Sequence, residues 1–81
     1  MGVQQTSAEA YHLIRNLGSR QRDVYTAIDI NGPVCNLHIA KILGKPINQI
    51  TPRTNELVQM GLVYEAYKET IEETGRKSIF W

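Results

Sequence analysis

The segment NLHIAKILGKPINQITPRTNELVQMGLV, residues 36–63, decides the fold. Its apolar residues recur at the spacing of two short amphipathic helices, and Gly44 and Gly61 stand where each helix should end. Asn36 has the side chain of an N-cap for the first helix, and Ala40 is small enough to let two helices cross closely. The inward side chains of this first helix are predicted to be Leu37, Ile39, Ala40 and Leu43.

The second helix of this segment has two plausible starts. Asn48 could cap a first turn, whereas Thr51 followed by Pro52 is the stronger signal, because proline is tolerated at the first helical position. We expect a loose turn from Asn48 that becomes regular at Thr51 and continues to Met60. Its inward side chains are predicted to be Ile50, Thr54, Leu57 and Val58.

Two further helices are predicted before this segment. Thr6 or Ser7 can cap a helix that ends at Gly18, and Ser19 can cap another that extends from Arg20 to Ile30. The apolar side of the first consists of Tyr11, Leu13, Ile14 and Leu17. Residues 31–33, Asn-Gly-Pro, break the second helix, and the pair at 34–35 is too short for an independent strand but could pair with the edge of a later hairpin.

The chain after Gly61 changes to residues typical of strands, LVYEAYKETI, followed by the turn EETGR and then KSIFW. This pattern predicts a β-hairpin over residues 62–81, with Gly75 at a positive-φ position and with Arg76 and Lys77 at the tip. The elements predict one domain over residues 7–81 after a flexible tail at residues 1–6. Its fold class is α+β and mostly α: a three-helix bundle, with the helix-turn-helix at 36–61, plus an extra N-terminal helix at 7–17 and the C-terminal hairpin.

This order of elements resembles the winged helix-turn-helix superfamily, which includes MarR-like and LexA-like DNA-binding domains. The resemblance covers about three quarters of the chain, and its matching residues are Ser19-Arg20-Gln21-Arg22-Asp23-Val24-Tyr25, Gly32-Pro33-Val34, Asn36-x-x-Ile39-Ala40-x-x-Leu43-Gly44, Glu56-Leu57-x-x-x-Gly61-Leu62-Val63 and Thr74-Gly75-Arg76-Lys77. More narrowly, Pro46-Ile47-Asn48-x-Ile50-Thr51-Pro52-Arg53 looks like small winged-helix proteins encoded in phage and prophage genomes. The resemblance implies that the second helix of the motif is a recognition helix and that the hairpin is a wing.

Eight polar or exposed residues are the candidates for DNA contact. Arginine presents a fork to guanine, whereas asparagine and glutamine pair with adenine, and helix N-termini or wing cations bind phosphates. Proline cannot donate a hydrogen bond, so Pro52 would read shape or a thymine methyl group. The candidates are Gln49, Thr51, Pro52, Arg53, Asn55, Asn36, Arg76 and Lys77.

Composition and charge limit the other functions. The net charge is only +1, and residues 62–81 carry four acids against three basic side chains, so we expect weak, salt-sensitive binding. A single cysteine excludes an internal disulfide, and without an apolar signal or spanning segment we expect a cytoplasmic protein with no membrane contact. Cys35 and His38 are half of a zinc pattern without a second half, so neither a metal nor another cofactor is expected. No nucleophile motif or phosphate loop indicates an enzyme.

We therefore expect a double-stranded DNA-binding protein that acts in transcription regulation or in phage-type DNA metabolism. The alternative is a winged helix that serves as a protein-protein interaction module in a larger assembly, since fold does not determine function and the charge is near neutral. Residues 7–17 could cover the core or form a homodimer contact, and coverage of the core is favoured in so short a chain.

Overall fold

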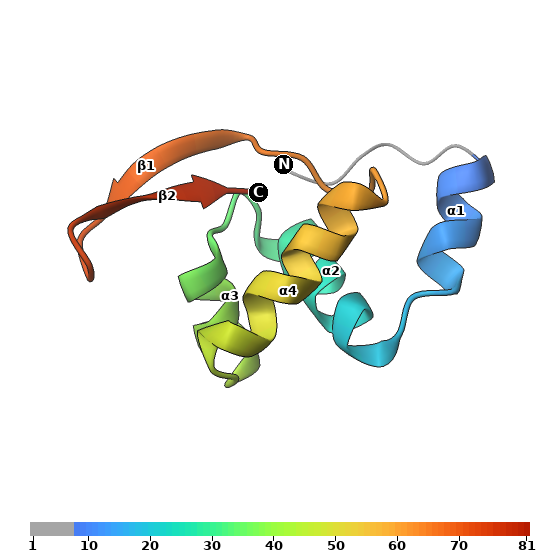
Figure 1. The fold of residues 1–81 in the computed structure, drawn as a ribbon, viewed down its shortest axis with the longest axis horizontal. Helices are drawn as coiled ribbons and strands as arrows, with labels where there is room; N and C mark the ends of the chain where they lie inside the picture. Colours follow the sequence, from blue (N-terminus) through green and yellow to red (C-terminus); the bar gives the residue numbers. More distant parts are fainter. Residues whose placement is uncertain (1–7) are drawn as a thin grey trace.

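The computed structural model describes the backbone of residues 8–81 and the side chains of residues 12–81 (Figure 1). Within them the chain is α+β and mostly helical, with four helices followed by a two-stranded antiparallel hairpin. The elements are α1 (Ala8–Arg15), α2 (Ser19–Asn31), α3 (Asn36–Leu43), α4 (Ile47–Gln59), β1 (Tyr67–Ile71) and β2 (Arg76–Phe80). The tail at 1–6, the caps Thr6 and Ser7, and the side chain of Tyr11 lie outside the described part.

Helices α2, α3 and α4 pack against one another around an aliphatic core. The prediction of the inward residues of α3 and α4 is largely confirmed. Ile39, Ile50 and Leu57 are almost fully buried, and Leu43 is partly buried against the same cluster. Val58, however, is 39% exposed, so its predicted place in the core is wrong. It lies one residue beyond Leu57, which is about 100° around the helix and away from the buried side.

The ends of α3 and α4 lie at glycines, as predicted, whereas α1 already ends at Arg15 and the starts of α2, α3 and α4 differ from the prediction. Gly44 and Gly61 adopt φ of 65° and 75°, the left-handed region that glycine enters without strain. Ser19 and Asn36 are the first helical residues and not the caps, which are Gly18 and Cys35. The Gly18 N–H donates instead to the Gln21 side chain at 3.1 Å, which satisfies one of the donors at the start of α2.

Helix α4 begins at Ile47, four residues before the predicted regular start, so Pro52 lies inside it. Proline lacks the N–H that would donate to the Asn48 carbonyl, so the helix forgoes one backbone hydrogen bond near its beginning. The Thr51 hydroxyl donates to the Ile47 carbonyl at 3.3 Å and adds a side-chain hydrogen bond in the same turn. The Thr51-Pro52 pair therefore marks the second turn of α4 and not its start.

The hairpin is shorter than predicted, because residues 62–66 precede the first strand. Leu62 and Val63 are buried in the helical core and lead to β1, which pairs with β2 in the register Tyr67 to Phe80 and Ile71 to Arg76. Gly75 has φ of 66°, as expected for the turn. The predicted pairing of residues 34–35 with the hairpin is confirmed by an isolated bridge from Cys35 to Phe80 and by two backbone hydrogen bonds between Val34 and Trp81.

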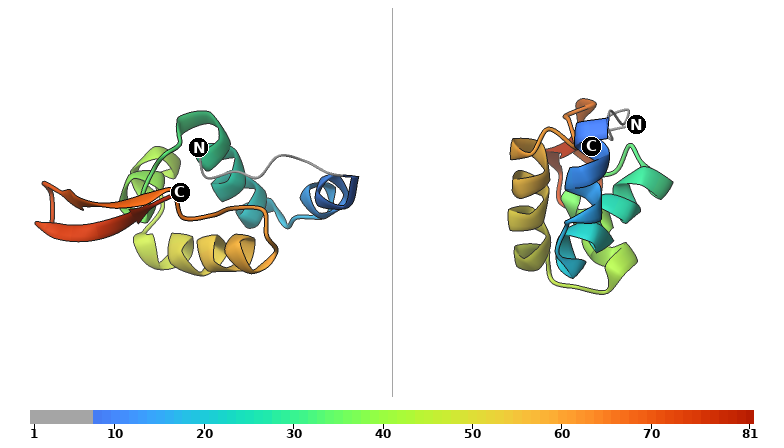
Figure 2. Two further views of the ribbon diagram at one scale, coloured as in Figure 1. Left: turned by 90° about the horizontal axis from the view of Figure 1, so that it is seen from above. Right: turned by 90° about the vertical axis from the view of Figure 1, so that its right-hand side faces the viewer.

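Helix α1 lies at the opposite end of the molecule from the hairpin turn (Figures 1 and 2). Leu17, just after α1, is buried in the core and Ile14 packs against it, whereas Leu13 is 39% exposed. This end of the chain therefore covers the core in part. Every helix within residues 8–81 is too short or too polar to cross a membrane.

Candidate functional site

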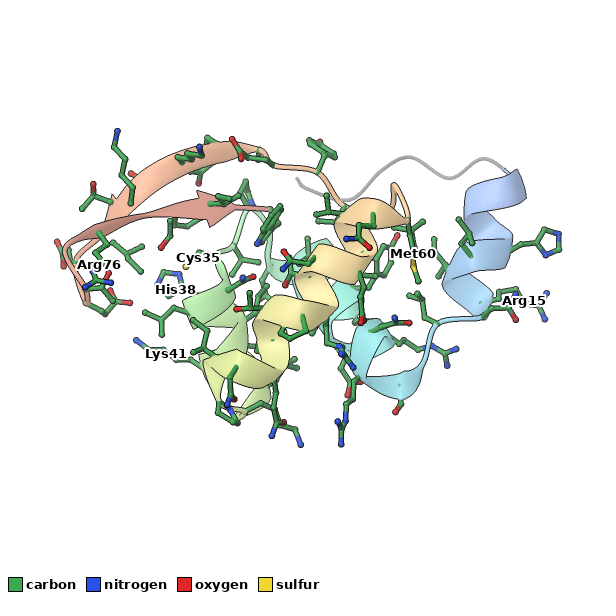
Figure 3. The ribbon with its side chains drawn as sticks, in the orientation of Figure 1. Arg15, Cys35, His38, Lys41, Met60 and Arg76 are labelled. Carbon is green, nitrogen blue, oxygen red and sulfur yellow. The ribbon has the colours of Figure 1, made fainter. Side chains whose placement is uncertain are left out.

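A groove of about 690 Å³ lies between the helices and the hairpin. Asn36 of α3 and residues 47, 51 and 55 of α4 line one side, and β2 with the end of β1 lines the other. Figure 3 shows Arg76 where the hairpin projects beyond α3 and α4. Five of the eight sequence candidates line this groove: Asn36, Thr51, Asn55, Arg76 and Lys77.

The outward face of α4 is polar and uncharged. Its members repeat at three- and four-residue intervals, the spacing of one side of a helix, and all are exposed. Opposite to them, Ile50, Thr54 and Leu57 are buried. We define the outward face as Asn48, Thr51, Pro52, Asn55 and Gln59.

The structure places Arg53 away from this outward face. Arg53 lies two residues from Thr51, about 200° around the helix, on the side toward α2. There its guanidinium forms an ion pair with Glu56, with Nε 3.1 Å from Oε1 and Nη2 donating to Oε2 at 3.2 Å. Gln21 of α2 donates to the same Glu56 carboxylate at 2.9 Å. The two charged residues of α4 therefore neutralise each other and join α4 to α2.

Gln49 also lies beside the outward face and not on it. It borders a small cavity of about 30 Å³ together with Arg20 and Asp23 of α2 and Lys45 of the turn between α3 and α4. Arg20 and Lys45 are exposed, so this flank holds two cations beside the beginning of α4.

Asn36 has a structural role that the capping prediction missed. Its Oδ1 accepts hydrogen bonds from the buried Thr54 hydroxyl and from Trp81 Nε1, both at 2.9 Å. Its Nδ2 lies 3.4 Å from the Thr51 hydroxyl, to which it donates. One amide therefore joins the start of α3, the middle of α4 and the end of the chain. The sequence contains no local signal for this, because the partners are 15 to 45 residues away.

The strand register separates the charges of the hairpin onto two faces. Directly paired residues of an antiparallel hairpin lie on the same face. Tyr67 stacks on Phe80 on the inner face, where Glu69 and Arg76 also belong by their alternation along the strands. The opposite face, which we call the outer face, holds Lys68, Thr70, Lys77 and Ile79, and of these Lys77 and Ile79 line the groove beside α4. It carries two cations and no acid, while Glu69 belongs to the inner face.

The hairpin turn is attached to α3 through Glu73. The Glu73 Oε2 atom lies 2.9 Å from His38 Nε2 and 3.3 Å from Lys41 Nζ. These two hydrogen bonds, with that from His38 the larger influence, lower the pKa of the Glu73 carboxyl. Figure 3 shows His38 and Lys41 on α3 beneath the hairpin. His38 is therefore engaged with a carboxylate, and Cys35 is buried as a free thiol.

Sequence reasoning could have found one of these contacts and not the others. Arg53 and Glu56 are three residues apart within a helix, a spacing at which opposite charges meet. The Glu73 contacts and the Asn36 contacts join residues that are distant in the chain, and only the fold brings them together. Within residues 8–81, no group of three or more His, Cys, Asp and Glu side chains is arranged to hold a metal ion.

Comparisons of this chain with protein-family models, with curated proteins and with solved structures found no match. The groove, the outward face of α4 and the outer face of the hairpin are the observations from which a function can be argued.

Proposed function

We propose that this chain is a winged helix-turn-helix protein that binds double-stranded DNA, with α4 as its recognition helix and the hairpin as its wing. The observation that carries the proposal is the groove, because it places the polar side of α4 next to Arg76 and Lys77. A duplex that received α4 in its major groove would present a phosphate backbone to the hairpin.

The residues divide into two roles under this proposal. The major groove of DNA is wide enough to admit a helix such as α4. The outward face of α4 would then meet the base edges through Thr51, Pro52 and Asn55. Arg76 and Lys77 contact phosphates, and so does Lys68, which shares the outer face with Lys77. Gln49 lies on the flank beside Arg20 and Lys45, and this flank meets the backbone on the other side of α4.

The charge distribution supports weak, salt-dependent binding. The net charge is +1, and the cations that are available lie on the hairpin and on the flank of α4. Each phosphate contact releases counterions. A few contacts therefore give a modest salt slope, which is the change in the logarithm of the affinity with the logarithm of the salt concentration. Such a protein would act in the cytoplasm as a transcription regulator or as a factor in phage-type DNA metabolism.

The decisive experiment is selection of bound fragments from a random duplex library at low ionic strength, followed by titration of the selected duplex at several salt concentrations. We expect enrichment and an affinity that falls as salt rises, with a slope set by the number of phosphate contacts. Lys77→Ala should weaken the binding of every duplex, and Glu69→Gln on the inner face is the matched control. If no duplex shows salt-dependent binding, the proposal is wrong.

One observation favours a second candidate function. The outward face of α4 lacks charge, and Ile47, Val58 and Met60 of the same region are 37–46% exposed. A partner protein could therefore dock on α4, with the same fold acting as an interaction module. Failure of the duplex selection together with a purified partner whose binding is lost in Asn55→Ala would favour this second function.

A further inference from the structure

The outward face of α4 has an unusual combination of side chains for a recognition helix, because it offers amides and apolar groups but no cation. From this composition we infer that α4 selects A·T base pairs, with amides on adenine and apolar groups on thymine. The inference rests on the proposed function and specifies the base pairs that the same site takes.

The outward face of α4 has no arginine that could bind guanine. Bidentate contact with guanine O6 and N7 from arginine or lysine is the commonest way in which proteins read G·C pairs in the major groove. The one cation of α4, Arg53, lies about 200° around the helix from Thr51 and is paired with Glu56 through both carboxylate oxygens. Gln21 holds Glu56 from α2, so the acid is fixed in place beside Arg53.

The outward face of α4 carries side-chain amides. Asn48, Asn55 and Gln59 are exposed on the outward face. The structure gives the Asn48 and Asn55 side chains no hydrogen-bond partner within residues 12–81, so both amides are available to a ligand. An amide donates to N7 and accepts from the N6 amino group of adenine, and no other base offers this pair of groups in the major groove.

Apolar groups lie beside these amides on α4. Pro52 is exposed on the outward face, and Ile47 is 46% exposed at the groove. The Thr51 hydroxyl is engaged by the Ile47 carbonyl and by Asn36, so its methyl group is the part that remains for contact. Apolar contact with the 5-methyl group is how proteins recognise thymine. Pro52, which contributes no hydrogen bond, is therefore suited to this face.

The experiment uses the duplex recovered in the selection described above. We expect its core to consist of A·T pairs with no invariant G·C pair. Each A·T pair is then replaced in turn by inosine·cytosine, which presents the major-groove groups of G·C and the minor-groove groups of A·T. At pairs read by α4 the affinity should fall about tenfold, which is the size of one good bidentate contact.

Two variants separate the roles of the α4 side chains. Asn55→Ala should abolish the preference for adenine at one position, while Arg53→Ala should leave the base preference unchanged. Both substitutions concern side chains outside the buried core, and circular dichroism verifies that the variants fold. Replacement of thymine by uracil, which lacks the methyl group, should weaken binding opposite Pro52 by a few-fold.

Four results would overturn the inference while leaving DNA binding established. The first three are an invariant guanine that is lost in Arg53→Ala, full affinity for the inosine·cytosine duplexes, and enrichment of duplexes without any base preference. Full adenine preference in the double variant Asn48→Ala/Asn55→Ala would overturn it as well. Failure of the proposed function is a different result, because then no duplex is enriched at any salt concentration.

Discussion

Helix α4 and the hairpin contribute in opposite ways to the surface that they share. The charged residues of α4 pair with each other and leave the outward face neutral, whereas the hairpin separates its charges and leaves Lys68 and Lys77 together on the outer face. Under the proposed function, α4 supplies selectivity and the hairpin supplies affinity that does not depend on sequence. This division of roles between α4 and the hairpin explains how a chain of net charge +1 could bind DNA.

The two regions also differ in how they are anchored. Three buried side chains and the Asn36–Thr54 hydrogen bond fix α4 along its length. The hairpin packs through one small cluster, in which Phe80 at its base and Ile71 beside its turn join Cys35, and the turn is also joined to α3 by Glu73. Substitutions should therefore have large effects on stability on the buried side of α4 and small effects at the exposed turn residues 72–75.

The largest effect should come from the inner side of α4. Leu57 is fully buried, so Leu57→Ala should lower the free energy of unfolding by about 2–5 kcal/mol through lost burial and a cavity. Val58, the next residue, is 39% exposed, and Val58→Ala is the matched control with a cost of about 0.5 kcal/mol or less. Urea denaturation measures both. Equal losses would mean that α4 does not pack as described.

The second largest effect should come from Asn36. Asn36→Ala leaves Trp81 Nε1 without its acceptor and leaves the buried Thr54 hydroxyl with only the Ile50 carbonyl, which should cost about 1–3 kcal/mol. Asn36→Asp keeps that acceptor and should retain most of the stability at neutral pH. If the two variants are equally unstable, the shared acceptor is not what joins α3, α4 and Trp81.

The fold could be predicted further than the site, for a physical reason. Gly44, Gly61 and Gly75 mark helix ends and a turn by local backbone chemistry, and apolar spacing placed Ile39 and Leu57 in the core. These signals depend on residues within a few positions of one another.

The site depends on contacts between distant parts of the chain. The role of Asn36 as a shared acceptor requires Trp81 to return beside α3, and local capping preference pointed elsewhere. Arg53 was a natural candidate for guanine, yet it lies off the outward face and pairs with Glu56, which Gln21 of α2 binds from a distant part of the chain. The register of the hairpin, which decides which charges share a face, is likewise a property of the pairing and not of composition.

A smaller effect, on binding and not on stability, should come from the outer face of the hairpin. Lys68→Ala and Lys77→Ala should each reduce affinity for all duplexes alike and lower the salt slope by about 1. Glu69→Gln, adjacent to Lys68 but on the inner face, is the control and should leave the slope unchanged. Equal slopes in all three variants would show that the outer face does not meet phosphates.

The smallest effect should be the pH dependence of the hairpin turn. Hydrogen bonds from His38 and Lys41 lower the pKa of Glu73 in the folded state, so the ionised carboxylate favours the attached turn. This contribution is fully present above the ordinary glutamate pKa of about 4.3 and is lost as the pH falls through the lowered folded value. The amide chemical shifts of Thr74 and Gly75, followed from pH 7 to pH 2.5, should therefore change together with Glu73 protonation.

Two variants determine whether Glu73 itself causes this change. Glu73→Gln removes the charge at every pH, so the turn amides should show the low-pH shifts already at pH 7. Glu72→Gln changes the neighbouring exposed carboxylate, for which the structure shows no ion pair within residues 12–81, and should titrate like the unmodified chain. Because the Glu73 side chain is exposed at the surface, the change should be confined to the turn and leave the core of α4 untouched. A pH response in Leu57 equal to that of Gly75 would mean that the two regions are not anchored separately.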